Sequence, residues 1–94
     1  MNEMNTIFLQ NVNKYFKGNE FKLWAYLYLY YCKYNKPYYR KDNNLEKALG
    51  KSKGSVTRTL NECVNKNYIW VHPYKNLIGY SPNYSLFRKM IKEE

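Results

Sequence analysis

Apolar positions recur every three or four residues near both ends of the chain and at its centre, a spacing that predicts amphipathic helices. The segment 21–34 is apolar nearly all round, which is typical of the buried central helix of a small domain. Turn residues follow residue 16, and Pro37 disfavours helical geometry at Lys36. We therefore predict helices at about 5–16, 21–34, 45–49 and 52–67, and a last helix from Pro82–Asn83 onwards.

A β-rich region separates the last two helices. Residues 68–72 and 77–80 carry strand-forming side chains, and Lys75 and Asn76 supply a turn between them, so this region predicts a hairpin. Pro73 should limit the pairing and make the hairpin irregular and edge-exposed. A short strand is expected at residues 38–40. The predicted fold class is mainly α with a small β-hairpin, in one domain spanning residues 1–94.

The most informative segment runs from Leu45 to Thr59, where one short helix ends at Gly50 and another begins at Ser52. Gly50 permits the positive φ of a sharp turn, and the Ser52 hydroxyl can cap the second helix. Asn43 and Glu46 form a variant of the capping box for the first helix. Two helices joined by so short a glycine-containing turn constitute a helix-turn-helix, whose second helix enters the DNA major groove.

The second helix of this motif has two chemically different sides. Its apolar side holds Val56, Leu60, Cys63 and Val64, which should anchor it to the core. The opposite side holds Lys53, Gly54, Thr57, Arg58 and Asn61, and Lys51, Ser52 and Ser55 lie near the helix N-terminus, where backbone N–H groups suit phosphate oxygens.

Several side chains on the polar side match the edges of DNA bases. Arg58 can pair with guanine and Asn61 with adenine, and Thr57 can touch a thymine methyl group or a phosphate. The alternative for Arg58 is a surface role, paired with Glu62 four residues on. Gly54 weakens a helix, which suggests that a side chain there would collide with something close.

Positive charge gathers around the motif. Between residues 33 and 75 there are ten basic and three acidic residues, which leaves +7 of the net charge of +9 in this span. Such placement favours a polyanionic partner. Arg40 and Lys41 could be phosphate contacts or free solvent charges, and Lys75 and Asn76 lie at the hairpin tip.

Little in the chain suggests catalysis, a cofactor or a metal site. The only histidine, His72, has no acid near it in sequence, and the four glycines are dispersed, without a phosphate-binding pattern. Cys32 and Cys63 lack metal-ligand spacing and are predicted to be buried free thiols in a reducing cytoplasm. The N-terminus shows no signal peptide, and residues 21–34 are too short to span a bilayer. We expect a cytoplasmic, non-enzymatic protein without membrane contact.

In the segment from Leu45 to Tyr80 the chain resembles the winged-helix superfamily of DNA-binding domains. Bacterial members show Leu-x-x-x-Leu-Gly-x-Ser-x-x-Ser/Thr-Val-x-Arg-x-Leu, then Gly-Tyr/Leu-Ile and a hairpin called the wing. The matching residues are Leu45, Leu49, Gly50, Ser52, Ser55, Val56, Arg58, Leu60, Tyr68 and Ile69, while Cys63 replaces a usual Leu and Asn67 a usual Gly. The resemblance implies a winged helix-turn-helix with extra N- and C-terminal helices that binds double-stranded DNA.

The chain has 18 Phe, Trp and Tyr residues, more than the core of a 94-residue domain can comfortably hide, so some should line an interface. Together with the resemblance, this predicts a homodimer with recognition helices roughly 34 Å apart. The stripes Phe8/Val12/Tyr15/Phe16 and Leu86/Phe87/Met90/Ile91 could form its interface or close the monomer core. Two roles are expected: a plasmid or phage transcriptional regulator, or a partition adaptor of the TubR type, which coats centromere repeats and recruits a filament-forming motor. A replication-initiator fragment and a module for protein or RNA contact remain alternatives.

Overall fold

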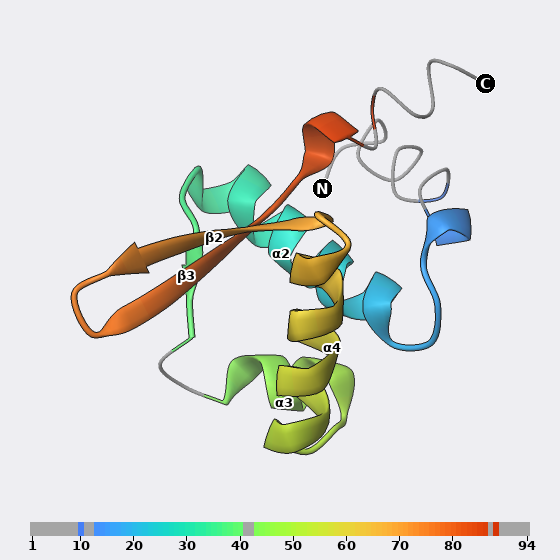
Figure 1. The fold of residues 1–94 in the computed structure, drawn as a ribbon, viewed down its shortest axis with the longest axis horizontal. Coiled ribbons are helices and arrows are strands. Elements are labelled where there is room, and N and C mark those ends of the chain that lie inside the picture. The colour runs from blue at the N-terminus through green and yellow to red at the C-terminus, as the bar shows by residue number, and fades with distance from the viewer. Residues whose placement is uncertain (1–9, 11–12, 41–42, 87, 89–94) are drawn as a thin grey trace.

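The structure is a computed structural model that describes residues 10, 13–40, 43–86 and 88. It contains three α-helices, one 3-10 helix and a three-stranded antiparallel sheet among those residues, so the mainly helical class with a β-hairpin is confirmed. Figure 1 shows the hairpin projecting away from the helices. The elements are η1 (Asn13–Tyr15), α2 (Glu20–Tyr34), β1 (Tyr38–Tyr39), α3 (Asn44–Leu49), α4 (Lys53–Asn65), β2 (Ile69–Tyr74) and β3 (Leu77–Pro82).

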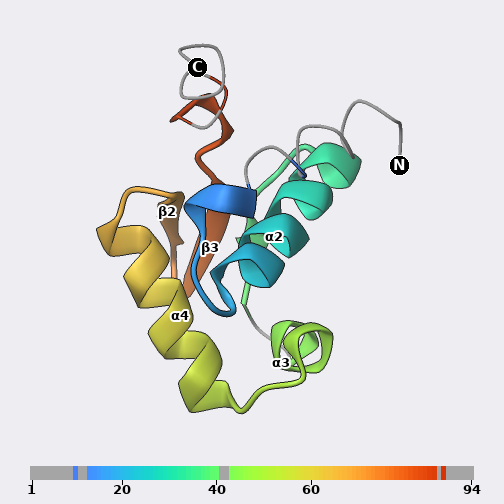
Figure 2. The ribbon, with the colours of Figure 1, turned by 90° about the vertical axis from the view of Figure 1, so that its right-hand side faces the viewer.

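Helix α2 lies at the centre of the core, as its apolar sequence predicted. Trp24 is completely buried, its ring stacks on Tyr28 with centroids 5.3 Å apart, and its indole N–H donates to the carbonyl oxygen of Tyr68 at 2.8 Å. Figure 2 shows α3 and α4 packed beside α2, with the sheet behind. Besides Trp24 and Tyr28, the buried apolar residues of these elements are Leu23, Leu27, Tyr38, Leu45, Leu49, Val56, Leu60, Cys63 and Ile69. The predicted apolar side of α4 is therefore confirmed, with Val64 partly buried against the same cluster.

The sheet has the strand order β1-β3-β2, so β2 is an edge strand. Pairing of β2 with β3 runs without a break from Ile69↔Pro82 to Tyr74↔Leu77 and includes Pro73↔Ile78. The predicted edge position is confirmed, and the predicted irregularity is wrong. The Arg40 N–H donates to the Ile78 carbonyl at 3.4 Å, so the Ile78 backbone groups face β1. Pro73, opposite Ile78, then has its nitrogen on the open edge, where no ladder bond is lost.

The two candidate interface stripes lie mostly outside the described residues, which exclude Phe8, Val12, Phe87, Met90 and Ile91. The described end of the first stripe packs inward: the Phe16 ring lies 5.6 Å from Trp24 and 5.4 Å from Tyr68. Of the predicted helix 5–16, the structure describes residue 10 and the 3-10 turn η1. At the other end, residues 84–86 form a helical turn, where the Asn83 Oδ1 accepts a hydrogen bond from the Leu86 N–H at 3.2 Å.

The two cysteines differ in burial, although both were predicted to be buried. Cys63 is fully buried, and that burial, assisted by the Glu20 carboxylate, raises the pKa of its thiol to about 12. Cys32 is exposed, because it lies on a part of α2 that the core does not cover. In the part of the chain that the structure describes, no helix has the length and apolar character needed to cross a membrane.

Candidate nucleic-acid interface

The turn between α3 and α4 has the local geometry that the sequence predicted. Gly50 adopts a φ of 65° at the end of α3, and its N–H donates to the carbonyl oxygen of Glu46. Ser52 is extended, and its hydroxyl oxygen accepts a hydrogen bond from the Ser55 N–H at 3.3 Å, so α4 begins at Lys53. Asn67 also takes the predicted left-handed conformation, with a φ of 64°.

The capping box predicted for α3 does not form. Asn43 occupies the N-cap position, but its side chain makes no capping hydrogen bond, because its backbone is not in the extended conformation that capping requires. The Glu46 carboxylate forms an ion pair with Arg40. The Arg40 guanidinium also donates a hydrogen bond to this carboxylate, which lowers the pKa of Glu46, although burial acts in the opposite direction.

The polar side of α4 faces solvent, as predicted. Its buried side includes Thr59, whose hydroxyl donates to the Ser55 carbonyl at 3.1 Å. Among the described residues, the structure records no ion pair between Arg58 and Glu62, which was the alternative for Arg58. The exposed positions are Lys51, Ser52, Lys53, Gly54, Thr57, Arg58 and Asn61, with Ser55 half-buried.

Gly54 is exposed and has open space beside it. A Cβ added at this position would meet no heavy atom within 4 Å, and the residue has no positive φ. The expected collision therefore does not come from the chain itself. Packing within the described residues gives no reason for glycine here.

Arg40 connects three parts of the motif. Its side chain is half-buried, with Nη1 donating to the Thr57 hydroxyl at 2.8 Å and Nη2 donating both to Glu46 and to the Lys53 carbonyl, the latter at 3.4 Å. Its backbone N–H reaches Ile78 of β3. Arg40 is thus not the free solvent charge that the sequence left open, while its neighbour Lys41 lies outside the described residues.

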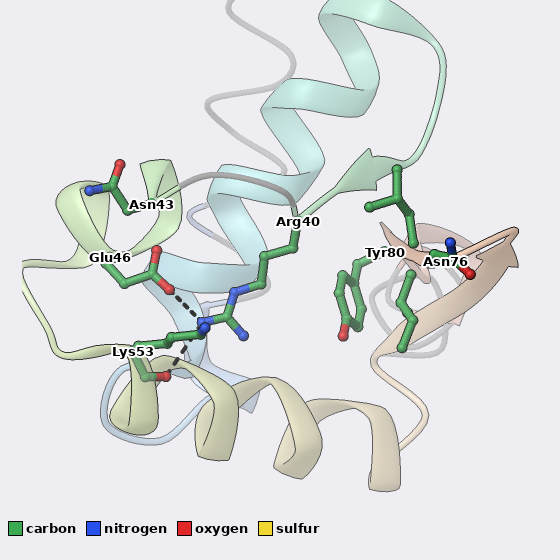
Figure 3. Close-up of a pocket in the computed structure, with 8 residues that line it drawn as sticks. Arg40, Asn43, Glu46, Lys53, Asn76 and Tyr80 are labelled. Carbon is green, nitrogen blue, oxygen red and sulfur yellow. Dashed lines mark hydrogen bonds and ion pairs between the residues drawn. The ribbon is translucent and has the colours of Figure 1, made fainter.

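A hollow of about 600 Å³ separates the start of α4 from the hairpin. Figure 3 shows Glu46 and Lys53 on one side, Asn76 and Tyr80 on the other, and Arg40 between them. The hollow is lined by Arg40, Asn43, Glu46, Lys53, Asn76, Leu77, Ile78 and Tyr80. The structure thus brings the beginning of the predicted recognition helix and the predicted hairpin tip to one surface.

Lys75 stands at the hairpin tip in a conformation that is unusual for a lysine. Its φ is 54°, and its ammonium group lies 5.4 Å from the centre of the Tyr74 ring. Both residues are exposed. A long cationic side chain at an exposed tip can extend well beyond the sheet.

A buried ion pair that supports the motif was not predicted from the sequence. Glu20 is buried, and its carboxylate accepts hydrogen bonds from the Lys66 ammonium at 2.7 Å and from the Lys17 N–H at 3.0 Å. The pair joins the start of α2 to the end of α4, and the bond with Glu20 raises the pKa of Lys66. Lys66 is 46 positions from Glu20 in the chain, so no local pattern indicates the contact.

A close approach between Gly79 and Tyr39 was not predicted either. A Cβ there would lie 2.8 Å from Cε1 of the Tyr39 ring, which crosses this part of β3. A lone glycine inside a strand is a recognisable sign of close approach. The sequence therefore held a signal for this contact.

His72 is half-buried, and its Nε2 lies 2.6 Å from the Ser81 hydroxyl oxygen. Within the described ranges, no group of three or more His, Cys, Asp or Glu residues could hold a metal ion. A scan against protein-family models, a search of curated proteins and a search of solved structures each found no match.

Proposed function

We propose that this protein binds double-stranded DNA sequence-specifically as a winged helix-turn-helix, with α4 as the recognition helix and the β2–β3 hairpin as the wing. The order α2-β1-α3-α4-β2-β3 and the sheet order β1-β3-β2 support this arrangement. The observation that carries the proposal is the shared hollow. Lys53 at the start of α4 and Asn76 at the hairpin tip line it together, so both elements can meet one DNA duplex.

The exposed side chains divide into two kinds of contact. Arg58 and Asn61 offer paired hydrogen-bonding groups for guanine and adenine edges in the major groove. Thr57 already accepts a hydrogen bond from Arg40, and its methyl group remains for a thymine. Phosphate contacts come from the N-terminal region of α4 and from the wing: Lys51, Ser52, Lys53, Ser55, Lys75 and Asn76.

Two cellular roles fit a small DNA reader of this kind, a transcriptional regulator and a partition adaptor that recruits a filament-forming motor. Either role would use a homodimer, because one helix makes few base contacts. Several iterated sites beside a gene for a filament-forming motor would favour partition. A single operator would favour repression.

Contact with another protein is a second candidate function. The hairpin exposes large apolar side chains, with Tyr74 56% and Ile78 49% exposed. Trp70 and Val71 on β2 are also exposed. The strand register places Trp70 and Tyr74 on one face of the hairpin and Val71 and Ile78 on the other, so each face carries exposed apolar groups of the kind found at interaction surfaces.

A fluorescence-anisotropy titration tests the DNA proposal, with duplex from the protein's own upstream region and random duplex at two salt concentrations. We expect Arg58→Ala to weaken specific binding by about 1–3 kcal/mol and to relax base preference. Lys75→Ala should weaken binding to all sequences similarly and reduce the salt slope by about one unit.

The outcomes separate the two candidate functions. Tight, sequence-dependent binding in several steps supports DNA recognition and a repeat-coating role. Weak binding that ignores sequence and vanishes with salt would reject it in favour of a protein partner. Equal losses on specific and random duplex for both variants would reject the division between base and phosphate contacts.

A further inference from the structure

Arg40 has the charge of a DNA-phosphate ligand, but its contacts assign it a different task. We infer that Arg40 is a positioning residue, which fixes the recognition helix α4 against the wing and does not bind DNA phosphate. The inference deepens the proposed function and rests on it for its DNA-binding consequences.

The Arg40 side chain already makes three hydrogen bonds within the protein. Both terminal nitrogens donate to acceptors on α3 or α4, and Glu46 balances the guanidinium charge. The Arg40 and Glu46 side chains are only 13% and 14% exposed. A phosphate could recruit Arg40 only by separating this pair, and the Glu46 Oε2 atom is already buried without a partner. Separation would leave a half-buried carboxylate uncompensated, which is costly.

The same contacts span the elements that must be aligned. The Arg40 backbone is bonded to Ile78 on β3, which is part of the wing. Its side chain reaches the Lys53 carbonyl in the first turn of α4 and the Thr57 hydroxyl one turn further on. One residue therefore joins the wing to the recognition helix, on the wall of the hollow between them (Figure 3). The planar fork of arginine can serve acceptors in several directions, which a lysine ammonium on one stem cannot reproduce.

Removing Glu46 separates the two roles, because they predict opposite signs. If Arg40 positions α4, Glu46→Ala should bind specific duplex about tenfold more weakly, with the salt slope unchanged. If Arg40 is a phosphate ligand restrained by Glu46, the same variant should bind more tightly and with a steeper slope. Glu62→Ala is the matched control, because it removes an exposed acid from α4 and gives the effect of net charge alone.

Substitutions of Arg40 provide the second comparison. Arg40→Lys keeps the positive charge but loses the planar guanidinium group. We therefore expect Arg40→Lys and Arg40→Gln to bind specific duplex about equally weakly, roughly tenfold more weakly than the unmodified protein, and with the same salt slope as the unmodified protein. Near-normal binding by Arg40→Lys, together with a slope reduced by about one unit in Arg40→Gln, would identify a phosphate ligand and overturn the inference. Unchanged binding by both variants would also overturn it.

A readout without DNA keeps this inference distinct from the proposed function. Amide hydrogen exchange in residues 53–57 should accelerate in Arg40→Lys and Glu46→Ala and stay unchanged in Glu62→Ala, all measured where circular dichroism shows folded protein. Unchanged exchange in the first two variants refutes positioning. If the unmodified protein binds no duplex while exchange accelerates as expected, the DNA proposal fails and the positioning of α4 by Arg40 stands.

Discussion

Gly54→Ala should change stability and DNA binding in opposite directions. Gly54 is exposed in the first turn of α4, has no positive φ and would accept a Cβ with no heavy atom within 4 Å. The protein therefore gains nothing internal from glycine at this position. If the recognition helix approaches DNA closely here, the added methyl group meets the duplex.

The magnitude follows from the cost of glycine in a helix. Alanine is favoured over glycine by about 0.5–1 kcal/mol, and the exposed methyl group adds little burial or strain. We expect the free energy of unfolding to rise by about 0.5–1 kcal/mol, which raises the melting temperature by about 2–8 °C in a domain of this size. Binding to specific duplex should weaken by about 1–3 kcal/mol, the usual range for inserting a methyl group into a packed contact.

Urea unfolding followed by circular dichroism measures the first quantity, and fluorescence anisotropy with specific duplex measures the second. Gly18→Ala is a control for the stability arm, because Gly18 has a φ of 57° and should lose about 1 kcal/mol when a Cβ is added. A more stable Gly54→Ala that binds DNA normally would place Gly54 outside the contact. A less stable variant would refute the reasoning about helix geometry.

Three further outcomes follow from the packing and the ion pairs. Gly79→Ala should lose about 1–3 kcal/mol of stability in thermal unfolding, and less in a Tyr39→Leu background, where the ring it would strike is gone; equal losses in both backgrounds would exclude that clash. Because the pKa of Glu46 is lowered in the folded protein, its stabilisation is complete above the usual value of 4.5 and is lost as pH falls through the lowered value. The stability difference between the unmodified protein and Glu46→Gln should therefore shrink on acidification, and a constant difference would contradict this. Leu60→Ala should cost about 2–5 kcal/mol in urea unfolding, since Leu60 is buried, and a loss below about 1 kcal/mol would contradict its core position.

The Arg40–Glu46 pair changes how the basic charge of the chain should be interpreted. Counting charges by sequence makes Arg40 one more cation available to a polyanion. In the fold its charge is balanced, and its donors hold α3 and α4. Among the described residues, the cations left on the proposed DNA surface are those of the helix start, of Arg58 and of the wing tip, and the salt slope should include their contribution but not that of Arg40.

The local geometry of the turn between α3 and α4 was predictable from the sequence, whereas the long-range contacts around that turn were not. The Gly50 turn, the Ser52 cap and the division of α4 into a buried and an exposed side were all read from neighbouring residues. A positive φ, a cap and helical periodicity depend on a few consecutive positions, so the sequence alone determined them. The order of helices and hairpin was predictable for the same reason.

Only the tertiary structure decided which distant side chains meet. Glu20 reaches Lys66 across 46 positions, and Arg40 reaches Thr57 across 17, because packing of α2 and α4 and the path of β1 bring them together. Cys32 and Cys63 were both predicted to be buried, yet only Cys63 is, since burial depends on which face of a helix another element covers. Local backbone preference acts over a few residues, whereas side-chain partners and solvent exposure are set by how whole elements pack.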